Sequence, residues 1–148
     1  MHSDKRLSWA LCLLRLSIFL VMLMWTLDKF LRPGHAAGVF AHFYAVTWLG
    51  ASALQAMGAL ELLLLLAFVT GVARRYSYGA VLMLHAGSTV ASWHQYLHPF
   101  EHVNLLFFGA WPMLAACAAL YLLRDSDRLT IDGMRHAART RSTHRSTI

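Results

Sequence analysis

The sequence has few charged residues. Asp, Glu, Lys and Arg together make up 14% of its 148 residues, whereas soluble domains carry about 25%. Hydrophobic residues make up 58%, so a soluble protein of this size would lack the surface charge that keeps it in solution. Cysteine is also scarce: two residues lie in apolar stretches, which excludes a disulfide scaffold and a CxxC redox motif. The composition indicates a small integral membrane protein.

Familiar catalytic motifs are missing as well. The sequence contains no P-loop, GxSxG, HExxH or dinucleotide-binding fingerprint, so no catalytic residue is assigned. The net charge of +6 is unevenly distributed, because six of the thirteen Lys and Arg residues follow Leu123. Basic residues beside a membrane segment fix its orientation and contact anionic headgroups. This distribution favours a membrane protein with no nucleic-acid partner.

Four apolar stretches are long enough to cross a bilayer core, which takes about 20 residues each. They cover residues 7–31, 50–72, 78–96 and 103–123. The sequence therefore predicts an all-α integral membrane protein, a four-transmembrane-helix bundle over residues 1–125, with a basic cytoplasmic tail over residues 126–148. Lys and Arg gather at the N-terminus, between the second and third spans, and in the tail. Both termini are therefore expected to face the cytoplasm, in a bacterial or archaeal cytoplasmic membrane.

The loop between the first two spans is rich in aromatic residues. Pro33 and Gly34 end the first span, and the segment HAAGVFAHFYAVTWLG follows. Aromatic side chains accumulate at the level of the lipid headgroups. We expect a short interfacial segment here, lying across one end of the bundle.

Three ionisable residues fall at similar depths in three different spans. At 1.5 Å per residue, Arg15 lies about 12 Å, Glu61 about 16 Å and His85 about 10 Å from the cytoplasmic ends of their spans. Ionisable groups inside a membrane need a partner or a function. The pattern predicts an ion pair between Arg15 and Glu61, with His85 nearby. This polar layer either locks the bundle or forms a site for a quinone headgroup or for proton transfer.

A second set of ionisable residues is predicted near the outer face of the membrane. It comprises Asp28, Lys29, His35, His42, His94, His98, Glu101 and His102. Imidazole and carboxylate groups suit zinc, copper or iron, and the candidate ligands of a metal ion are His94, His98 and His102. Histidines at a membrane interface also serve as ordinary hydrogen-bonding residues, and Pro99 disfavours a helical conformation at His98. Both interpretations stay open.

The first span carries a longer recognisable pattern. Its stretch RLSIFLVMLMWTLDKFLRP begins at Arg15 and closes with Asp28-Lys29-Phe30 before Pro33. The second span contains Gly58-Ala59-Leu60-Glu61, and LTID at residues 129–132 follows the last span. These motifs resemble the DoxX/DoxD-like family of small four-helix membrane proteins of bacteria and archaea.

The resemblance covers residues 7–132 and implies both a four-helix fold and a redox setting. Some relatives are subunits of thiosulfate:quinone oxidoreductase, and others belong to membrane complexes that respond to oxidative stress. Arg15, Lys29 and Glu61 match positions of the family pattern. The histidine-rich segment between the third and fourth spans does not map to that pattern. The resemblance therefore does not assign a thiosulfate-linked activity to this chain.

Together these features predict a membrane subunit of a quinone-linked respiratory or redox complex. The features leave two candidate cofactors open, a quinone and a metal ion, and the expected partners are the lipid bilayer, other membrane or periplasmic subunits, and further copies of the chain. Two alternatives belong to other functional classes. One is a non-catalytic structural or assembly subunit of a larger membrane complex, and the other is a metal-handling protein of the periplasmic face.

Overall fold

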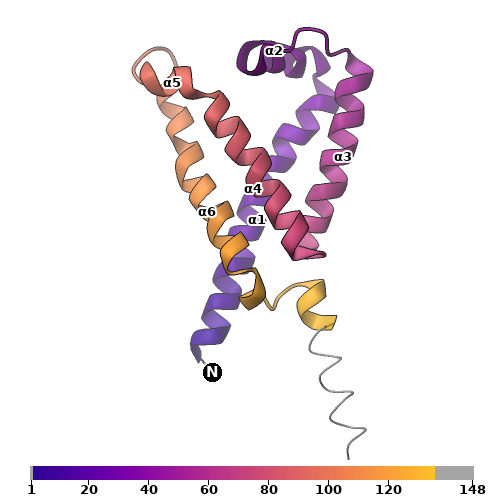
Figure 1. Ribbon diagram of the computed structural model, residues 1–148, viewed down its shortest axis with the longest axis vertical. Coiled ribbons are helices and arrows are strands. Elements are labelled where there is room, and N and C mark those ends of the chain that lie inside the picture. The colour runs from indigo at the N-terminus through magenta and orange to yellow at the C-terminus, as the bar shows by residue number, and fades with distance from the viewer. Residues whose placement is uncertain (1, 136–148) are drawn as a thin grey trace, which may run out of the picture.

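The computed structural model describes residues 2–135, and these residues form helices and connecting loops with no strand (Figure 1). The helices are α1 (His2–Leu31), α2 (Pro33–Tyr44), α3 (Ala51–Thr70), α4 (Arg74–Ala91), α5 (Trp93–Leu97) and α6 (Ala110–Leu122). Two 3₁₀ helices are η1 (Asn104–Gly109) and η2 (Arg124–Ser126). The predicted all-α fold is confirmed. The third predicted span corresponds to α4 and α5, and the fourth to η1 and α6.

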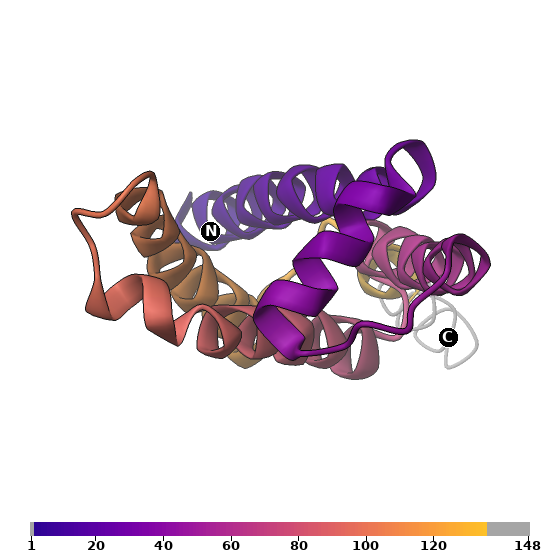
Figure 2. The same ribbon diagram turned by 90° about the horizontal axis from the view of Figure 1, so that it is seen from above.

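Helices α1, α3, α4 and α6 form a bundle in which the chain runs alternately up and down (Figure 1). Helix α1 packs against α3 and α6, and α4 packs against the same two helices from the other side. Figure 2 shows this order from above, with α2 crossing the end of the bundle from α1 toward α4. The predicted segment between the first two spans is therefore a helix that covers one end of the bundle.

Three helical segments are long and apolar enough to cross a membrane. They are Asp4–Leu31, Ala51–Thr70 and Asn104–Leu122. At most 28% of the apolar window of each segment is buried within the protein, and large side chains such as Trp9, Leu13 and Leu20 are exposed. An exposed apolar surface of this extent needs an apolar environment. The chain is a multi-pass membrane protein in a lipid bilayer.

Two breaks between helices set where the chain turns at the ends of the bundle. Pro33 occupies the start of α2, and Arg32 before it leaves the helical region at φ −137°, as a residue that precedes proline tends to do. Gly71 ends α3 in the left-handed region at φ +67°, a conformation that glycine adopts without steric cost. These breaks turn the chain across one end of the bundle and back into α4 at the other.

The most buried part of the apolar core lies between α1, α3, α4 and α6. Its buried members are Leu11, Ile18, Met22, Leu65, Phe68, Tyr78, Val81, Cys117 and Leu120. The rings of Phe68 and Tyr78 meet edge to face, with centroids 5.1 Å apart. Burial of these side chains, and of the small cysteine, supplies the packing that holds the four helices together.

The segment after α6 belongs to the folded domain. Asp127 is fully buried and Thr130 is 2% exposed, so the domain boundary predicted after residue 125 lies too early. Within the predicted cytoplasmic tail, Asp127 and Thr130 are thus buried against the bundle, and residues 136–148 lie outside the described part of the chain.

Candidate functional site

A buried polar network joins α1, α4 and the segment after α6. The Arg15 guanidinium forms an ion pair with the Asp127 carboxylate, and both side chains are almost completely buried. Arg15 Nη1 also donates to the Tyr78 hydroxyl at 3.0 Å, and that hydroxyl donates to Asp127 Oδ2 at 2.8 Å. Arg15 Nη2 donates to the Leu129 carbonyl oxygen at 2.6 Å. We call Arg15, Tyr78 and Asp127 the inner network.

Several contacts hold the segment after α6 in place beside this network. Arg74 Nη1 donates to the carbonyl oxygens of Arg124 at 2.5 Å and Asp127 at 2.8 Å. The Thr130 hydroxyl donates to the Asp127 carbonyl oxygen at 3.1 Å. Thr130 also packs against Gly71, where an added Cβ would overlap its side chain. These contacts turn Asp127 inward, where its carboxylate compensates the buried charge of Arg15.

The predicted polar layer of Arg15, Glu61 and His85 does not form. Arg15 pairs with Asp127, whereas the Glu61 carboxylate pairs with Lys29 Nζ at 2.7 Å. His85 is buried and its Nε2 lies 3.1 Å from the Ala110 carbonyl oxygen. The ion pair predicted between Arg15 and Glu61 is wrong, because depth in a span does not specify the direction in which a side chain leaves its helix.

The opposite end of the bundle carries an acid that contacts two basic side chains. Asp28 Oδ1 accepts a hydrogen bond from Arg32 Nε at 2.7 Å, and Asp28 Oδ2 lies 2.6 Å from His35 Nδ1. The Asp28 side chain is 7% exposed, whereas that of His35 is 49% exposed. Asp28 lies on α1 and His35 on α2, so the chain break at Pro33 brings them together. We call Asp28, Arg32 and His35 the outer cluster.

A second ion pair lies beside the outer cluster. Lys29 on α1 and Glu61 on α3 form it with side chains that are 12% and 15% exposed. The helices approach closely here because Gly58 has no side chain: an added Cβ would lie 2.8 Å from the Phe30 ring. Burial, and then the nearby Glu61 carboxylate, raise the pKa of Tyr44 above its ordinary value. Tyr44 therefore stays a neutral hydroxyl donor at the end of α2 at neutral pH.

The remaining predicted outer residues lie on α2, α5 and the loop after α5. His42 Nε2 is 3.3 Å from Gln95 Nε2, which links α2 to α5. The His94 and His98 rings have centroids 4.7 Å apart, and His98 Nδ1 is 3.4 Å from the Glu101 carboxylate. His102 is exposed at a left-handed position of the loop.

These histidines do not assemble into the predicted metal site. Within residues 2–135, no group of three or more His, Cys, Asp or Glu side chains is arranged to hold a metal ion. The loop places His102 apart from the contact between His94 and His98, because the chain leaves the helical path after Leu97. The regular spacing of histidines expected from a continuous helix therefore ends before the third candidate ligand.

Comparison with protein-family models, curated proteins and solved structures finds no match for the chain. Its function is therefore inferred from the chemistry of its two polar sites, the inner network and the outer cluster.

Proposed function

We propose that the chain is a membrane subunit of a quinone-linked redox complex and that the outer cluster binds the quinone headgroup. The observation that carries the proposal is the contact between Asp28, which is buried, and His35, whose imidazole is half exposed. An imidazole that is both held by a carboxylate and accessible at the end of a membrane bundle accepts a proton from a quinol hydroxyl, and as imidazolium it donates to a quinone oxygen. Of the two polar sites, the outer cluster alone combines these properties, because the side chains of the inner network are buried.

The chemistry of the pair follows from its geometry. The ionised carboxylate of Asp28 favours the tautomer of His35 that carries a proton on Nδ1. The Nε2 atom of His35 is then an acceptor for the hydroxyl proton of a quinol, and Asp28 stabilises the imidazolium that forms. Arg32 donates to the other oxygen of Asp28 and keeps the carboxylate ionised. Oxidation of a quinol releases two protons and two electrons. His35 accepts one proton, the other passes to the water at the end of the bundle, and the partner subunits take both electrons.

The proposed topology supports this location. The start of α1 carries Lys5 and Arg6, the start of α4 carries Arg74 and Arg75, and η2 begins at Arg124. In Figure 1 the starts of α1 and α4 and the end of α6 share the lower end of the bundle. Basic residues concentrate on the cytoplasmic side of membrane proteins. With α4 as the fourth crossing, both termini then face the cytoplasm of a bacterial or archaeal cell and the outer cluster faces the periplasm or exterior. The motifs of the first span support membership of the DoxX/DoxD-like family.

Quinone binding to the purified chain in lipid nanodiscs tests the proposal. Titration with decylubiquinone and decylmenaquinone is followed by the quenching of tryptophan fluorescence. We expect Asp28→Asn and His35→Gln each to weaken the binding of at least one quinone about tenfold, because each substitution removes the carboxylate–imidazole contact. Glu101→Gln, an exposed substitution on the same side, is the matched control and should leave binding unchanged.

Two results would overturn the proposal. The first is equal quinone affinity for the unaltered chain, Asp28→Asn and His35→Gln. The second comes from native mass spectrometry of the protein extracted gently from its own membrane. Membership of a redox complex requires other subunits to accompany the chain, and a chain that emerges alone excludes that membership.

A non-catalytic structural or assembly subunit is the second candidate, and the inner network favours it. Arg15, Tyr78 and Asp127 are buried and hydrogen-bonded to one another, which is the arrangement of a structural lock. Under this function, substitution in the inner network lowers the yield of the assembled complex, and substitution in the outer cluster changes neither yield nor turnover.

A further inference from the structure

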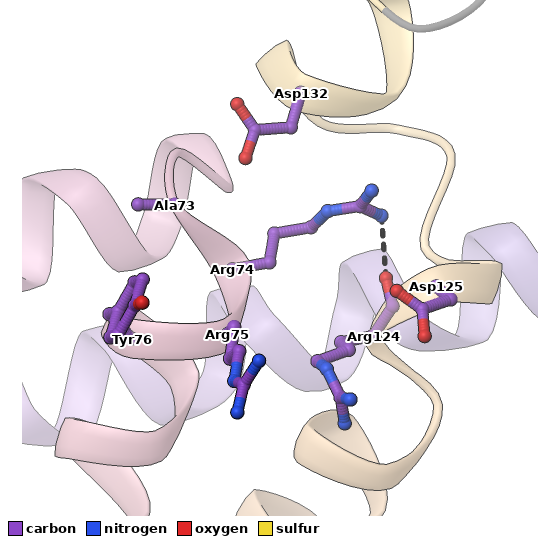
Figure 3. A pocket seen from close by; sticks show the side chains of 7 residues that line it. All are labelled: Ala73, Arg74, Arg75, Tyr76, Arg124, Asp125 and Asp132. Carbon is purple, nitrogen blue, oxygen red and sulfur yellow. Dashed lines mark hydrogen bonds between the residues drawn. The ribbon is translucent and has the colours of Figure 1, made fainter.

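A shallow hollow of about 250 Å³ opens at the lower end of the bundle, away from the outer cluster. It is lined by Ala73, Arg74, Arg75, Tyr76, Arg124, Asp125 and Asp132 (Figure 3). Three arginines and two aspartates give it a net positive charge. Neither the buried inner network nor the proposed quinone site uses this surface.

The three arginines differ in the contacts that they make within the protein. Arg74 is engaged, because its Nη1 atom donates to two carbonyl oxygens of the segment after α6. Arg124 is held in place through Nη1, which donates to the Tyr121 carbonyl oxygen at 2.7 Å, and its guanidinium stacks 4.8 Å from the Tyr121 ring centroid. Arg75 is exposed, and within residues 2–135 it makes no side-chain hydrogen bond or ion pair. Two guanidinium groups therefore retain donors for a ligand.

The two guanidinium groups with free donors lie on the same side of the hollow. In Figure 3, Arg75 from the start of α4 and Arg124 from the start of η2 extend in the same direction. Asp132 lies on the far side of Arg74 from them. Among the described residues neither Asp125 nor Asp132 forms an ion pair with an arginine. Both guanidinium groups are therefore on one side of the hollow, and neither is engaged in an ion pair with the two aspartates that line it.

The surroundings of the hollow are those of a membrane interface. It lies where α3 ends, α4 begins and α6 ends, which is the level of the lipid headgroups for helices that cross a bilayer. Tyr76 is 74% exposed beside it, and Leu122 at the end of α6 is 73% exposed. Tyrosine at this level anchors to headgroups, and the exposed Leu122, two residues before Arg124 in the chain, suits an apolar environment.

We propose that Arg75 and Arg124 bind the phosphate group of an anionic phospholipid. Guanidinium donates paired hydrogen bonds to phosphate oxygens, and two guanidinium groups together match a phosphate that carries a full negative charge. The exposed Tyr76 favours a lipid over a soluble phosphate compound, because it lines the same hollow at the level of the headgroups. A zwitterionic lipid binds more weakly, since its own ammonium group competes for the phosphate.

Native mass spectrometry with added phospholipid tests this site on the full chain. The detergent-solubilised protein is titrated with phosphatidylglycerol and, separately, with phosphatidylcholine of the same acyl chains. We expect phosphatidylglycerol to bind at least fivefold more tightly, and Arg75→Gln with Arg124→Gln to abolish that preference. Replacement of both arginines by lysine should keep only part of the preference, because the charge remains but the paired guanidinium donors are lost. Lys5→Gln with Arg6→Gln removes the same charge from the same end and serves as the control.

The outcomes separate a built site from general charge. Loss of the preference in the Arg75/Arg124 variant but not in the Lys5/Arg6 variant supports the proposal. Equal loss in both variants, or loss in neither, overturns it. A competition experiment with inorganic phosphate at millimolar concentration distinguishes a lipid from a soluble phosphate. Displacement of the bound lipid assigns the site to a soluble phosphate and overturns the lipid assignment. Unchanged far-ultraviolet circular dichroism verifies that each variant is folded.

Discussion

The inner network and the outer cluster are built from the same kinds of groups but in different ways. The inner network joins Arg15 to residues 63 and 112 positions further along the chain, and its side chains are buried. The outer cluster joins Asp28 to residues four and seven positions away, and its basic side chains are largely exposed. The inner network thus holds distant segments together, whereas the outer cluster presents ionisable groups to the surroundings.

The difference in burial has an energetic consequence. Removing one partner of a buried ion pair leaves an uncompensated charge in a medium of low polarity, at a cost of about 3–5 kcal/mol. Pairs near water gain about 0–1 kcal/mol, because solvent screens each charge and the side chains lose conformational freedom. We therefore expect the inner network to dominate stability and the outer cluster to contribute mainly to ligand binding.

The largest expected effect follows the removal of the inner acid. Asp127→Ala leaves the Arg15 guanidinium without its carboxylate and takes an acceptor from the Tyr78 hydroxyl. We expect the free energy of unfolding to fall by about 3–5 kcal/mol. Titration with sodium dodecyl sulfate in mixed micelles measures this change.

The neighbouring acid provides a control for that experiment. Asp125 is exposed, so Asp125→Ala should change the free energy of unfolding by less than about 0.5 kcal/mol. Asp127→Asn keeps a side-chain oxygen for the Tyr78 hydroxyl and should fall between the two. A loss in Asp127→Ala no greater than that in Asp125→Ala would contradict the structural role of the inner network.

Much of the fold follows from the sequence. Runs of apolar residues predict the membrane helices, and Pro33 marks the break at which α2 begins. The need of Arg15 for an acidic partner is also evident, because a charge in a membrane span is costly. The sequence does not reveal which acid is the partner. Depth along a helix is proportional to residue number, but the direction of a side chain around the bundle depends on how the helices pack.

Asp127 is hard to predict as a partner because the segment around it is polar and basic, a composition typical of a tail. Its burial depends on contacts far along the chain, namely those of Arg74 and Gly71 with the segment after α6. The apolar Leu129 and Ile131 do not mark the buried positions of this segment either, because Leu129 is 41% exposed whereas Thr130 between them is buried. The outer cluster is easier to anticipate, since its three residues are close in sequence and flank a proline that forces a turn.

An intermediate effect is expected at the glycine that supports the segment after α6. Gly71 has φ +67° and an added Cβ would overlap the Thr130 side chain. Gly71→Ala combines left-handed strain of about 1–2 kcal/mol with overpacking, so we expect a total loss of about 2–3 kcal/mol. The same titration in mixed micelles measures it.

Gly87 is the matched control for this substitution. It lies inside α4, and a Cβ added there would have no atom within 4 Å, so Gly87→Ala should be neutral or stabilise the protein by up to about 1 kcal/mol. If Gly71→Ala and Gly87→Ala shift the free energy of unfolding equally, the packing of Thr130 on Gly71 contributes nothing to the inner network.

The smallest effect belongs to the ion pair between Lys29 and Glu61, which is intermediate between the two polar sites. It joins α1 to α3 over 32 positions, as the inner network joins distant segments, yet it lies beside the outer cluster with side chains that are 12% and 15% exposed.

A double-mutant cycle of Lys29→Met and Glu61→Gln isolates its energy, and we expect a coupling of about 1 kcal/mol. A coupling of about 4 kcal/mol would show that this degree of burial already gives the pair the strength of the inner network. A coupling of the expected size would show that access of water to an ion pair controls how much it stabilises the bundle. The Lys29–Glu61 pair, which is less buried, would then contribute less than the Arg15–Asp127 pair.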